Sequence, residues 1–318
     1  MTPMSLQVQQ VDRVTVWVVT DNYFDALRPD GKIARRFRLT GPGRSIHAEH
    51  GLSYYIETVI DEKTSACMFD YGQDSLGVSN NLDLLGIDPG KVQAFGLSHG
   101  HFDHWGGAID ILKRARSSMP PDTPFYVGEE CFAHRFLSRP GDTVPMDLGR
   151  LKKEEIEAAG FRVVEVSGPV EIIPGAYLTG NIERVTPYEK VPPVLVIERG
   201  GKLEPDDFRG EQAIFFHVRG KGLVVLSGCA HAGIVNTVRQ AQKIAGTEKI
   251  HAILGGFHLI NAKPEIIRKT LDDIKAIKPD FVAPTHCTGL EAIEAFEREM
   301  PEAFNLNTAG SHYTFGGG

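Results

Sequence analysis

The stretch "LSHGHFDHWGG", residues 97–107, decides how this sequence is interpreted. It places three histidines and one aspartate within six positions, directly after an apolar run: His99, His101, Asp103 and His104. His99 and His101 are two residues apart, so the end of an extended strand points both side chains the same way. Imidazole nitrogens and carboxylate oxygens suit zinc, iron or manganese. The cluster therefore predicts a metal site; the alternative is a surface loop held by hydrogen bonds.

Two later strands end in a similar way. The run "GLVVLSG" continues into "CAH" at residues 229–231, and "DFVAPTH" ends at His286. His231 and His286 are therefore predicted metal ligands. Cys229 leaves two interpretations open, because a thiolate binds zinc well and a cysteine is also a common small buried residue.

Three further residues lie close to these strand ends. His258 follows the strand at 250–256, and the ligands already named are enough for two metals. We therefore interpret His258 as a catalytic residue that binds substrate or donates a proton, with a purely supporting role as the alternative. His50 in "EHGLS" is a candidate for contact with the substrate in the same cavity. Cys287, next to His286, is predicted to point away from the site and to be structural.

The segment "HGHFDH" (99–104) resembles the H-x-H-x-D-H motif of the metallo-β-lactamase fold superfamily, and "FDYG" (69–72) resembles its upstream D-x-G element. The resemblance implies an α/β (α+β) fold, a four-layer αββα sandwich with metals at one edge of its two sheets. It also implies that Asp70 orients the ligands without binding metal. Asp103 would both bind metal and act in catalysis. Cys229 stands where the superfamily usually has a bridging aspartate.

Five segments together resemble one branch of this superfamily: "EHGLS", "SHGHFDHWGG", "SGCAHAGI", "GGFHL" and "PTHCTG". The branch is that of the 7,8-dihydropterin-6-methyl-4-(β-D-ribofuranosyl)aminobenzene-5′-phosphate synthase-like metal-dependent hydrolases. It implies a hydrolase of a small ester or phosphate-type substrate, acting through a hydroxide on two divalent metals, zinc first and iron or manganese as alternatives. Left open are a pterin-type transferase that releases pyrophosphate, a diiron redox protein on the same fold, and a non-catalytic metal-stabilised binding protein.

Alternating strand and helix patterns fit this fold class. Short β-branched runs predict strands at 14–19, 54–60, 66–72, 92–98, 124–128, 161–166, 170–180, 193–200, 212–218, 222–228, 250–256 and 280–286. Apolar spacing near 3.6 predicts helices at 105–117, 129–137, 151–159, 232–245, 264–277 and 288–299. Because no Pro/Gly/Ser-rich linker divides the chain, we expect one domain over residues 1–318.

Residues 181–211 are the most loop-like region, with Pro187, Pro192, Pro193 and the acidic run "EPDD", and we expect them to form a flap over the site. Arg184 and Tyr188 in this region are predicted to contact an anionic substrate, since an arginine can bind phosphate with two hydrogen bonds. The alternative is that they belong to a solvated loop.

Composition limits the partners. The 318-residue chain carries 34 basic and 41 acidic residues, a net charge of −7, which gives no support to nucleic-acid binding. Four cysteines are too few for a disulfide scaffold. The start lacks the apolar stretch of a secretory signal, and the longest apolar runs are too short to cross a membrane. We expect a cytoplasmic protein that acts on a small molecule, with a homo-oligomer left open.

Overall fold

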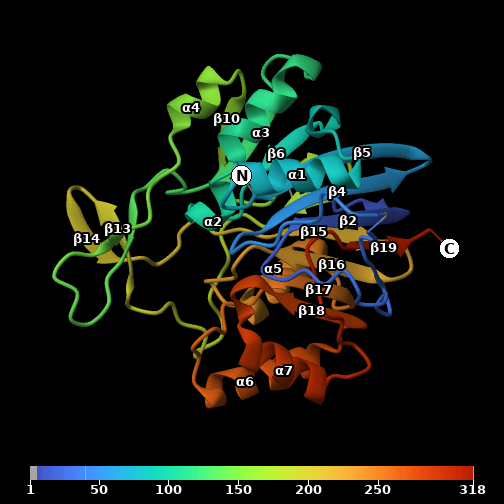
Figure 1. Ribbon diagram of the computed structural model, residues 1–318. Helices are drawn as coiled ribbons and strands as arrows, with labels where there is room; N and C mark the ends of the chain where they lie inside the picture. The colour runs from blue at the N-terminus through green and yellow to red at the C-terminus, as the bar shows by residue number, and fades with distance from the viewer. Residues whose placement is uncertain (1–5, 40, 318) are drawn as a thin grey trace.

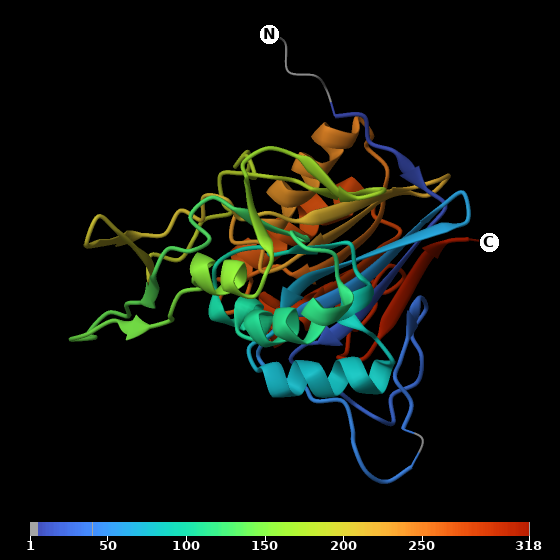
Figure 2. The same ribbon diagram turned by 90° about the horizontal axis from the view of Figure 1, so that it is seen from above.

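The structure is a computed structural model that describes residues 6–39 and 41–317. Two large β-sheets pack face to face, and helices cover the outer face of each sheet (Figures 1 and 2). The predicted four-layer αββα sandwich is therefore confirmed. In the described part of the chain, no helix has the length and apolar character needed to cross a bilayer.

The first large sheet is 8-stranded and comes mainly from the N-terminal half of the chain. Its strands β5, β6, β7 and β10 are parallel, and the others pair antiparallel. In spatial order they are β10 (Arg162–Val166), β7 (Pro124–Gly128), β6 (Ala94–Gly96), β5 (Lys63–Tyr71), β4 (Ser53–Ile60), β2 (Arg13–Thr20), β19 (His312–Gly316) and β3 (Ala34–Arg35).

The second large sheet is 7-stranded and comes mainly from the C-terminal half. Its last three strands, β16 to β18, run parallel, so their carboxyl ends lie at the same edge. In order the strands are β11 (Val170–Ile173), β12 (Ala176–Leu178), β15 (Ile214–Val218), β16 (Gly222–Ser227), β17 (Ile250–Gly256) and β18 (Phe281–Thr285), with β1 (Gln10–Val11) beside β15.

Three apolar clusters separate the four layers. One fills the space between the two sheets and includes Ile56, Phe69 and Leu254. A second joins the 8-stranded sheet to its covering helices α1 (Ser75–Leu85), α2 (Phe102–Trp105), α3 (Ala108–Ala115) and α4 (Lys153–Ala158). A third joins the 7-stranded sheet to α5 (Ile234–Ala245), α6 (Pro264–Ile277) and α7 (Leu290–Glu299).

The predicted helix at 105–117 is broken into α2 and α3 by two glycines. A Cβ atom on Gly106 would lie 2.2 Å from the Gln73 carbonyl oxygen, and one on Gly107 would lie 2.4 Å from that of Tyr71. Only glycine allows this close approach of α2 and α3 to the end of β5. The glycines therefore fix how the histidine-bearing segment sits on the sheet.

Helix α1 was not predicted from the sequence. Its buried face carries Gly77 and Asn81 besides Val78 and Leu82, so the apolar spacing is weak. Asn81 instead hydrogen-bonds the main chain of neighbouring segments, donating to the Val19 carbonyl at 2.9 Å. Tertiary hydrogen bonds thus replace part of the apolar pattern that helix prediction relies on.

The predicted helix at 129–137 is wrong. Residues 135–137 form a strand of a small third sheet, which projects from the sandwich (Figure 1). Arg135 is buried there and its Nε donates to Asp206 Oδ2 at 2.7 Å. A buried ion pair and main-chain pairing to residues 195–197 override the local helical pattern. The sheet has the order β14 (Lys202–Pro205), β13 (Leu195–Arg199), β8 (Arg135–Leu137) and β9 (Met146–Asp147).

Replacing Asp206 with alanine is expected to lower the free energy of unfolding by about 3 kcal/mol or more, because the Arg135 guanidinium would stay buried without its partner. Urea denaturation measures this. The double variant Arg135→Met, Asp206→Leu should recover part of the loss. A single variant as stable as the parent protein would contradict the argument.

Candidate metal centre

The parallel strands of the 7-stranded sheet bring four predicted site residues to one edge. Cys229 and His231 follow β16, His258 follows β17, and His286 follows β18. All four residues lie beyond the carboxyl ends of their strands, so main-chain geometry alone gathers them. Of these, His258 and His286 have left-handed backbone angles, with φ of 46° and 53°. Such conformations cost energy for a residue with a side chain and cluster at functional sites.

The 8-stranded sheet contributes the other half of the centre from the ends of β5 and β6. Asp70, fully buried at the end of β5, accepts hydrogen bonds from the Ser98 amide at 2.7 Å and the Ser98 hydroxyl at 2.8 Å. It also accepts from His104 Nδ1 at 2.6 Å. Ser98 Oγ in turn lies 2.9 Å from His99 Nδ1. Asp70 thus holds His104 directly and His99 through Ser98.

Potential ligand atoms converge on Cys229. Two sets of side chains, each with its ligand atoms within 4.8 Å of one another, share this sulfur: one is Asp103, His104, Cys229 and His286, and the other is His99, Cys229 and His231. His104 Nε2 lies 3.2 Å from Cys229 Sγ. His101 lies outside both sets, although its ring centroid is 4.8 Å from those of His99 and His231.

Several imidazole nitrogens in this cluster are buried without a hydrogen-bond partner among the described residues. They include His99 Nε2 and both ring nitrogens of His231. Burial holds the pKa values of His99 and His231 well below the usual range and lowers that of His101 to about 3. These rings are therefore neutral at pH 7, with lone pairs directed into a buried space.

Asp103 carries the negative charge of the centre. Burial would raise the pKa of Asp103, but His104 and His286 outweigh it and hold this pKa well below its usual range. Burial likewise disfavours protonated His286, yet the Asp103 carboxylate, 3.2 Å from Nε2, raises the pKa of His286 to about 9. Metal binding to this set would therefore have to release a proton from His286.

The sequence is similar to that of one named enzyme over nearly its whole length. No family model matches the sequence. The chain is 30% identical over 315 residues to the 7,8-dihydropterin-6-methyl-4-(β-D-ribofuranosyl)-aminobenzene-5′-phosphate synthase of Methanocaldococcus jannaschii, covering 98% of this chain and 100% of that protein. The chain belongs to the family of this synthase. It has the metallo-β-lactamase fold.

Two further matches are consistent with this assignment. The uncharacterized protein MJ0448 of the same organism is 27% identical over 254 residues, which is 79% of this chain and 88% of that one. Among solved structures, Tm1679, a metal-dependent hydrolase of the β-lactamase superfamily, superposes with a TM-score of 0.70 at 23% identity. That match covers 95% of this chain and 98% of the other. Because the M. jannaschii relative that is 30% identical is a synthase, we conclude that the present protein is an enzyme.

The residues present fit the metal that the superfamily fold implies. Unpartnered buried imidazole nitrogens and an ionised carboxylate around one sulfur form a donor set of N, O and S ligands, which suits zinc and related transition metals. His99, His104, His231, His286, Asp103 and Cys229 would hold it. Cys229 lies at the centre of the cluster, where the superfamily usually has its bridging aspartate.

The prediction that Cys287 points away from the site is wrong. Its sulfur forms a third set with Cys229 Sγ and a His258 ring nitrogen, again within 4.8 Å of one another. Residues 286–288 form a 3-10 turn, which carries Cys287 back over the strand ends instead of extending the strand. His258, interpreted as catalytic, lies beside the centre, with its ring centroid 4.0 Å from that of His231.

Sequence reasoning missed two buried carboxylates that hold the cluster in place. Glu211 accepts hydrogen bonds from the main-chain amides of His231 at 2.7 Å and Ala232 at 2.5 Å, and burial raises its pKa to about 7 against those bonds. Asp21 accepts hydrogen bonds from Asn307 Nδ2 and from the hydroxyl of Thr285, the residue directly before His286. Each acid stands next to the end of an apolar strand, which is the only indication that the sequence offers.

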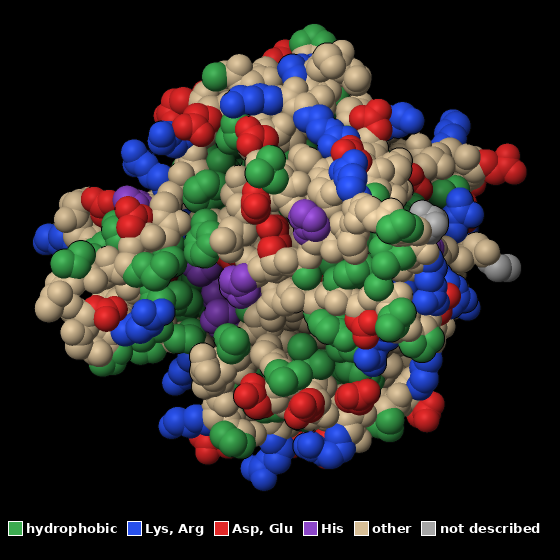
Figure 3. Space-filling view, in the orientation of Figure 1, with side chains coloured by type: hydrophobic (Ala, Val, Ile, Leu, Met, Phe, Trp, Pro, Cys, Tyr) green, Lys and Arg blue, Asp and Glu red, His purple; other side chains and the backbone are tan. Residues whose placement is uncertain are grey.

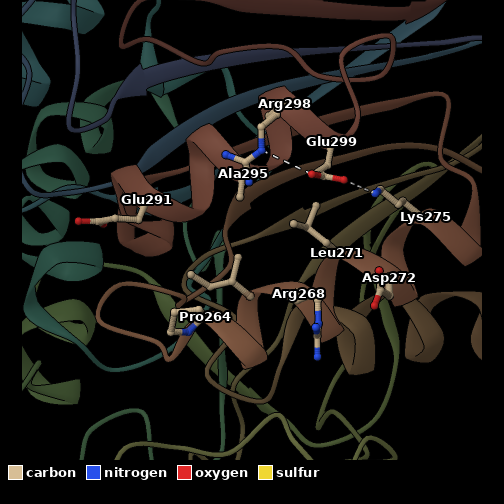
Figure 4. A pocket seen from close by; sticks show the side chains of 10 residues that line it. Pro264, Arg268, Leu271, Asp272, Lys275, Glu291, Ala295, Arg298 and Glu299 are labelled. Atoms are coloured by element: carbon tan, nitrogen blue, oxygen red, sulfur yellow. Dashed lines mark hydrogen bonds and ion pairs between the residues drawn. The ribbon is translucent and has the colours of Figure 1, made fainter.

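A cavity of about 1000 Å³ opens beside the centre and is lined by His231 and His258. Residues 187–195, from the segment predicted as a flap, form one wall, and residues 257–270 form much of the rest. Figure 3 shows histidine side chains gathered in a hollow bordered by hydrophobic ones. A second hollow, between α6 and α7, is lined by none of the predicted site residues (Figure 4).

The three predicted substrate contacts have different surroundings. His50 is half exposed, lies 3.6 Å from the Asp103 carboxylate and stacks on His286. Tyr188 lines the cavity, although its hydroxyl is bound to Asp273. Arg184 does not line it: the guanidinium donates to the main-chain carbonyls of His231 at 3.2 Å and Asp207 at 2.9 Å. Arg184 thus fixes the loop that carries His231.

Replacing Asp70 with asparagine is expected to weaken metal binding about 10–100-fold, because it removes the charged acceptor that orients His104 and Ser98. Competition with a chromogenic chelator measures the affinity. Asp122→Asn is the matched control, since Asp122 is exposed and, like Asp70, has a left-handed backbone that asparagine tolerates. Equal affinities in the two variants would exclude an orienting role for Asp70.

Proposed function

We propose that the protein is a metal-dependent hydrolase that acts on an ester or phosphate group of a small anionic molecule. The observation that carries this proposal is the convergence of unpartnered imidazole nitrogens, Asp103 and Cys229 at one end of a large cavity. Two ligand sets that share one sulfur suit two divalent ions, zinc first and iron or manganese as alternatives. Bound there, such ions supply a water of lowered pKa and polarise a carbonyl or phosphoryl oxygen.

The chain's own residues then have separable roles. The Asp103 carboxylate, already ionised, accepts a hydrogen bond from the attacking water and keeps it oriented. His258 lines the cavity, and its Nδ1 is buried without a partner among the described residues. It is therefore placed to donate a proton to a leaving group or to stabilise negative charge that develops on the substrate.

The cavity wall supports an anionic substrate with an apolar part. Three lysines line it and form no ion pair among the described residues: Lys190, Lys263 and Lys269. Much of the remaining wall is apolar, with Val191, Leu259 and other aliphatic side chains. Unpaired ammonium groups around an apolar cavity favour a phosphate or carboxylate attached to a hydrophobic or aromatic body. Two glutamates, Glu189 and Glu265, also line the cavity, so its basic side chains exceed its acidic ones by one.

The second candidate is the pterin-type transferase reaction, in which pyrophosphate leaves. It is favoured by the 30% identity to the M. jannaschii synthase, which extends over 98% of this chain. The same cavity could hold a pterin ring against its apolar wall and a phosphate near the lysines. The two candidates differ in the nucleophile, which is water in one and a second substrate in the other.

Elemental analysis of the purified protein, together with a substrate panel, tests the proposal. The panel contains phosphomonoesters, phosphodiesters, lactones and β-lactams, and the transferase pair of pterin pyrophosphate with ribosylaminobenzene phosphate.

We expect metal in the protein and turnover of at least one ester or phosphate. Asp103→Ala should abolish turnover and lower the metal content. Product formation only with the transferase pair would favour the second candidate, and visible absorption from iron with no turnover would favour a redox protein. A metal content near zero would overturn the site itself.

Replacing His258 with asparagine is expected to lower kcat about 100-fold or more while the metal content stays unchanged, because the side chain acts on the substrate. Turnover and metal per chain are measured on the same preparation. His47→Asn, an exposed histidine away from the cavity, is the control. A fall in metal content in His258→Asn would make His258 a ligand and contradict its assignment as a proton donor.

The double variant Lys263→Gln, Lys269→Gln is expected to raise KM about tenfold for a phosphate-bearing substrate, with a smaller effect on an uncharged ester, because only the former loses charged hydrogen bonds. Lys202→Gln on β14, outside the cavity, controls for the loss of charge. Equal effects on both substrates would show that the lysines do not bind the anion.

A further inference from the structure

Two of the four free cysteines lie together over the end of β17. Cys229, beyond β16, and Cys287, beyond β18, are both buried, and their sulfurs are within 4.8 Å of each other and of a His258 ring nitrogen. Cys287 Sγ also donates to the main-chain oxygen of Cys229 at 3.4 Å. Two residues 58 positions apart in the sequence therefore present their thiols to the same small space.

Gly256, at the end of the intervening strand β17, leaves room for this approach. A Cβ atom on Gly256 would lie 2.7 Å from Cys287 Sγ and 3.2 Å from the Cys229 Cα, and also 2.4 Å from the Gly228 carbonyl oxygen. Any side chain here would push the two cysteine-bearing segments apart. Strand β17 lies between β16 and β18 in the sheet, but because it ends in a glycine, no side chain at that position separates the two sulfurs.

The remaining cysteines provide a contrast within the same molecule. Cys67 packs in the cluster between the sheets and Cys131 in the cluster under α1, α3 and α4. Both are as buried as Cys229 and Cys287, but neither belongs to a group of cysteine, histidine or acidic side chains within ligand distance among the described residues. Burial alone therefore does not distinguish the pair; proximity does.

We propose that Cys229 and Cys287 are a redox modification site, at which a peroxide converts the two thiols into a reversible disulfide. Sulfurs this close need only side-chain rotation and a small shift of the strand-end loops to reach bonding distance. His258 borders both the cysteine pair and the cavity, so a small oxidant that enters the cavity reaches the pair past one side chain.

The reaction balances with the peroxide as the sole oxidant. The sulfur of one thiol attacks a peroxide oxygen and the O–O bond breaks; the sulfur keeps one OH as a sulfenic acid, and the other OH takes the thiol proton and leaves as water. The sulfur of the second thiol attacks the sulfenic sulfur and the S–O bond breaks; the departing OH takes the second thiol proton and leaves as a second water. Two electrons pass from the two sulfurs to the peroxide; the sum is two thiols and one hydrogen peroxide giving one disulfide and two waters.

One consequence rests on the proposed function. Cys229 belongs to both predicted ligand sets, so a disulfide to Cys287 would remove the shared sulfur from the metal centre. Oxidation would then release metal, and bound metal would protect the thiols. The disulfide itself depends only on the positions of the two sulfurs, and thiol counting detects it without reference to any enzymatic activity.

The test treats the purified full-length protein with hydrogen peroxide, with and without added zinc, and counts free thiols after denaturation. We expect four thiols to fall to two, with recovery in dithiothreitol, and a Cys229–Cys287 cross-linked peptide in the mass spectrum. Zinc should slow the loss at least tenfold. An unchanged rate with zinc would overturn the coupling to metal while leaving the disulfide in place.

Matched serine variants complete the design. Neither Cys287→Ser nor Cys229→Ser should form the internal disulfide. In Cys67→Ser, peroxide should lower the number of free thiols from three to one. Peptide mapping of the parent protein stands independently of whether the variants fold. Absence of the Cys229–Cys287 peptide while thiols are lost, or cross-links that instead involve Cys67 or Cys131, would overturn the proposal.

Discussion

The buried carboxylate of Asp70 is the contact on which the geometry of the centre depends. It accepts three hydrogen bonds, two from Ser98 and one from His104, and so joins the ends of β5 and β6 to helix α2. A buried carboxylate is costly unless its oxygens are satisfied, and here all three donors lie within 2.8 Å. The same bonds that satisfy the charge orient two of the imidazoles. The hydrogen bonds to Asp70 therefore both stabilise the junction of β5, β6 and α2 and orient the candidate ligands.

The sandwich brings the two halves of the centre together because parallel strands in both sheets end at the same edge. Apolar runs that stop at histidines could be recognised in the sequence, which is why the positions of His99, His104, His231 and His286 were predictable. The four layers were predicted only through the resemblance to the metallo-β-lactamase fold, because strand and helix patterns alone indicate no more than an α/β or α+β class. The 3-10 turn after β18 was not, since nothing local shows that the chain turns back and brings Cys287 into the centre.

Other features escaped prediction because they depend on contacts between distant segments. Helix α1 is held by the hydrogen bonds of Asn81, and strand β8 by the buried pair of Arg135 with Asp206. Glu211 is equally invisible to a periodic pattern, because its function is to accept two amides of the loop that carries His231. In each case a polar side chain is buried where pattern reading expects either an apolar residue or a surface one.

The centre combines buried imidazole nitrogens that lack a hydrogen-bond partner among the described residues with the thiol of Cys229, which could be reduced or oxidised. A buried donor or acceptor without a partner costs about 1–3 kcal/mol, so a metal that binds His99 and His231 would offset this cost and stabilise the fold. An aspartate at the position of Cys229 could also bind metal but could not form a disulfide. If Cys229 binds metal as proposed, a thiol at this position, next to a second thiol, would make the affinity for metal depend on the redox state. The residue that departs from the superfamily pattern is thus the one through which the surroundings could act on the metal centre.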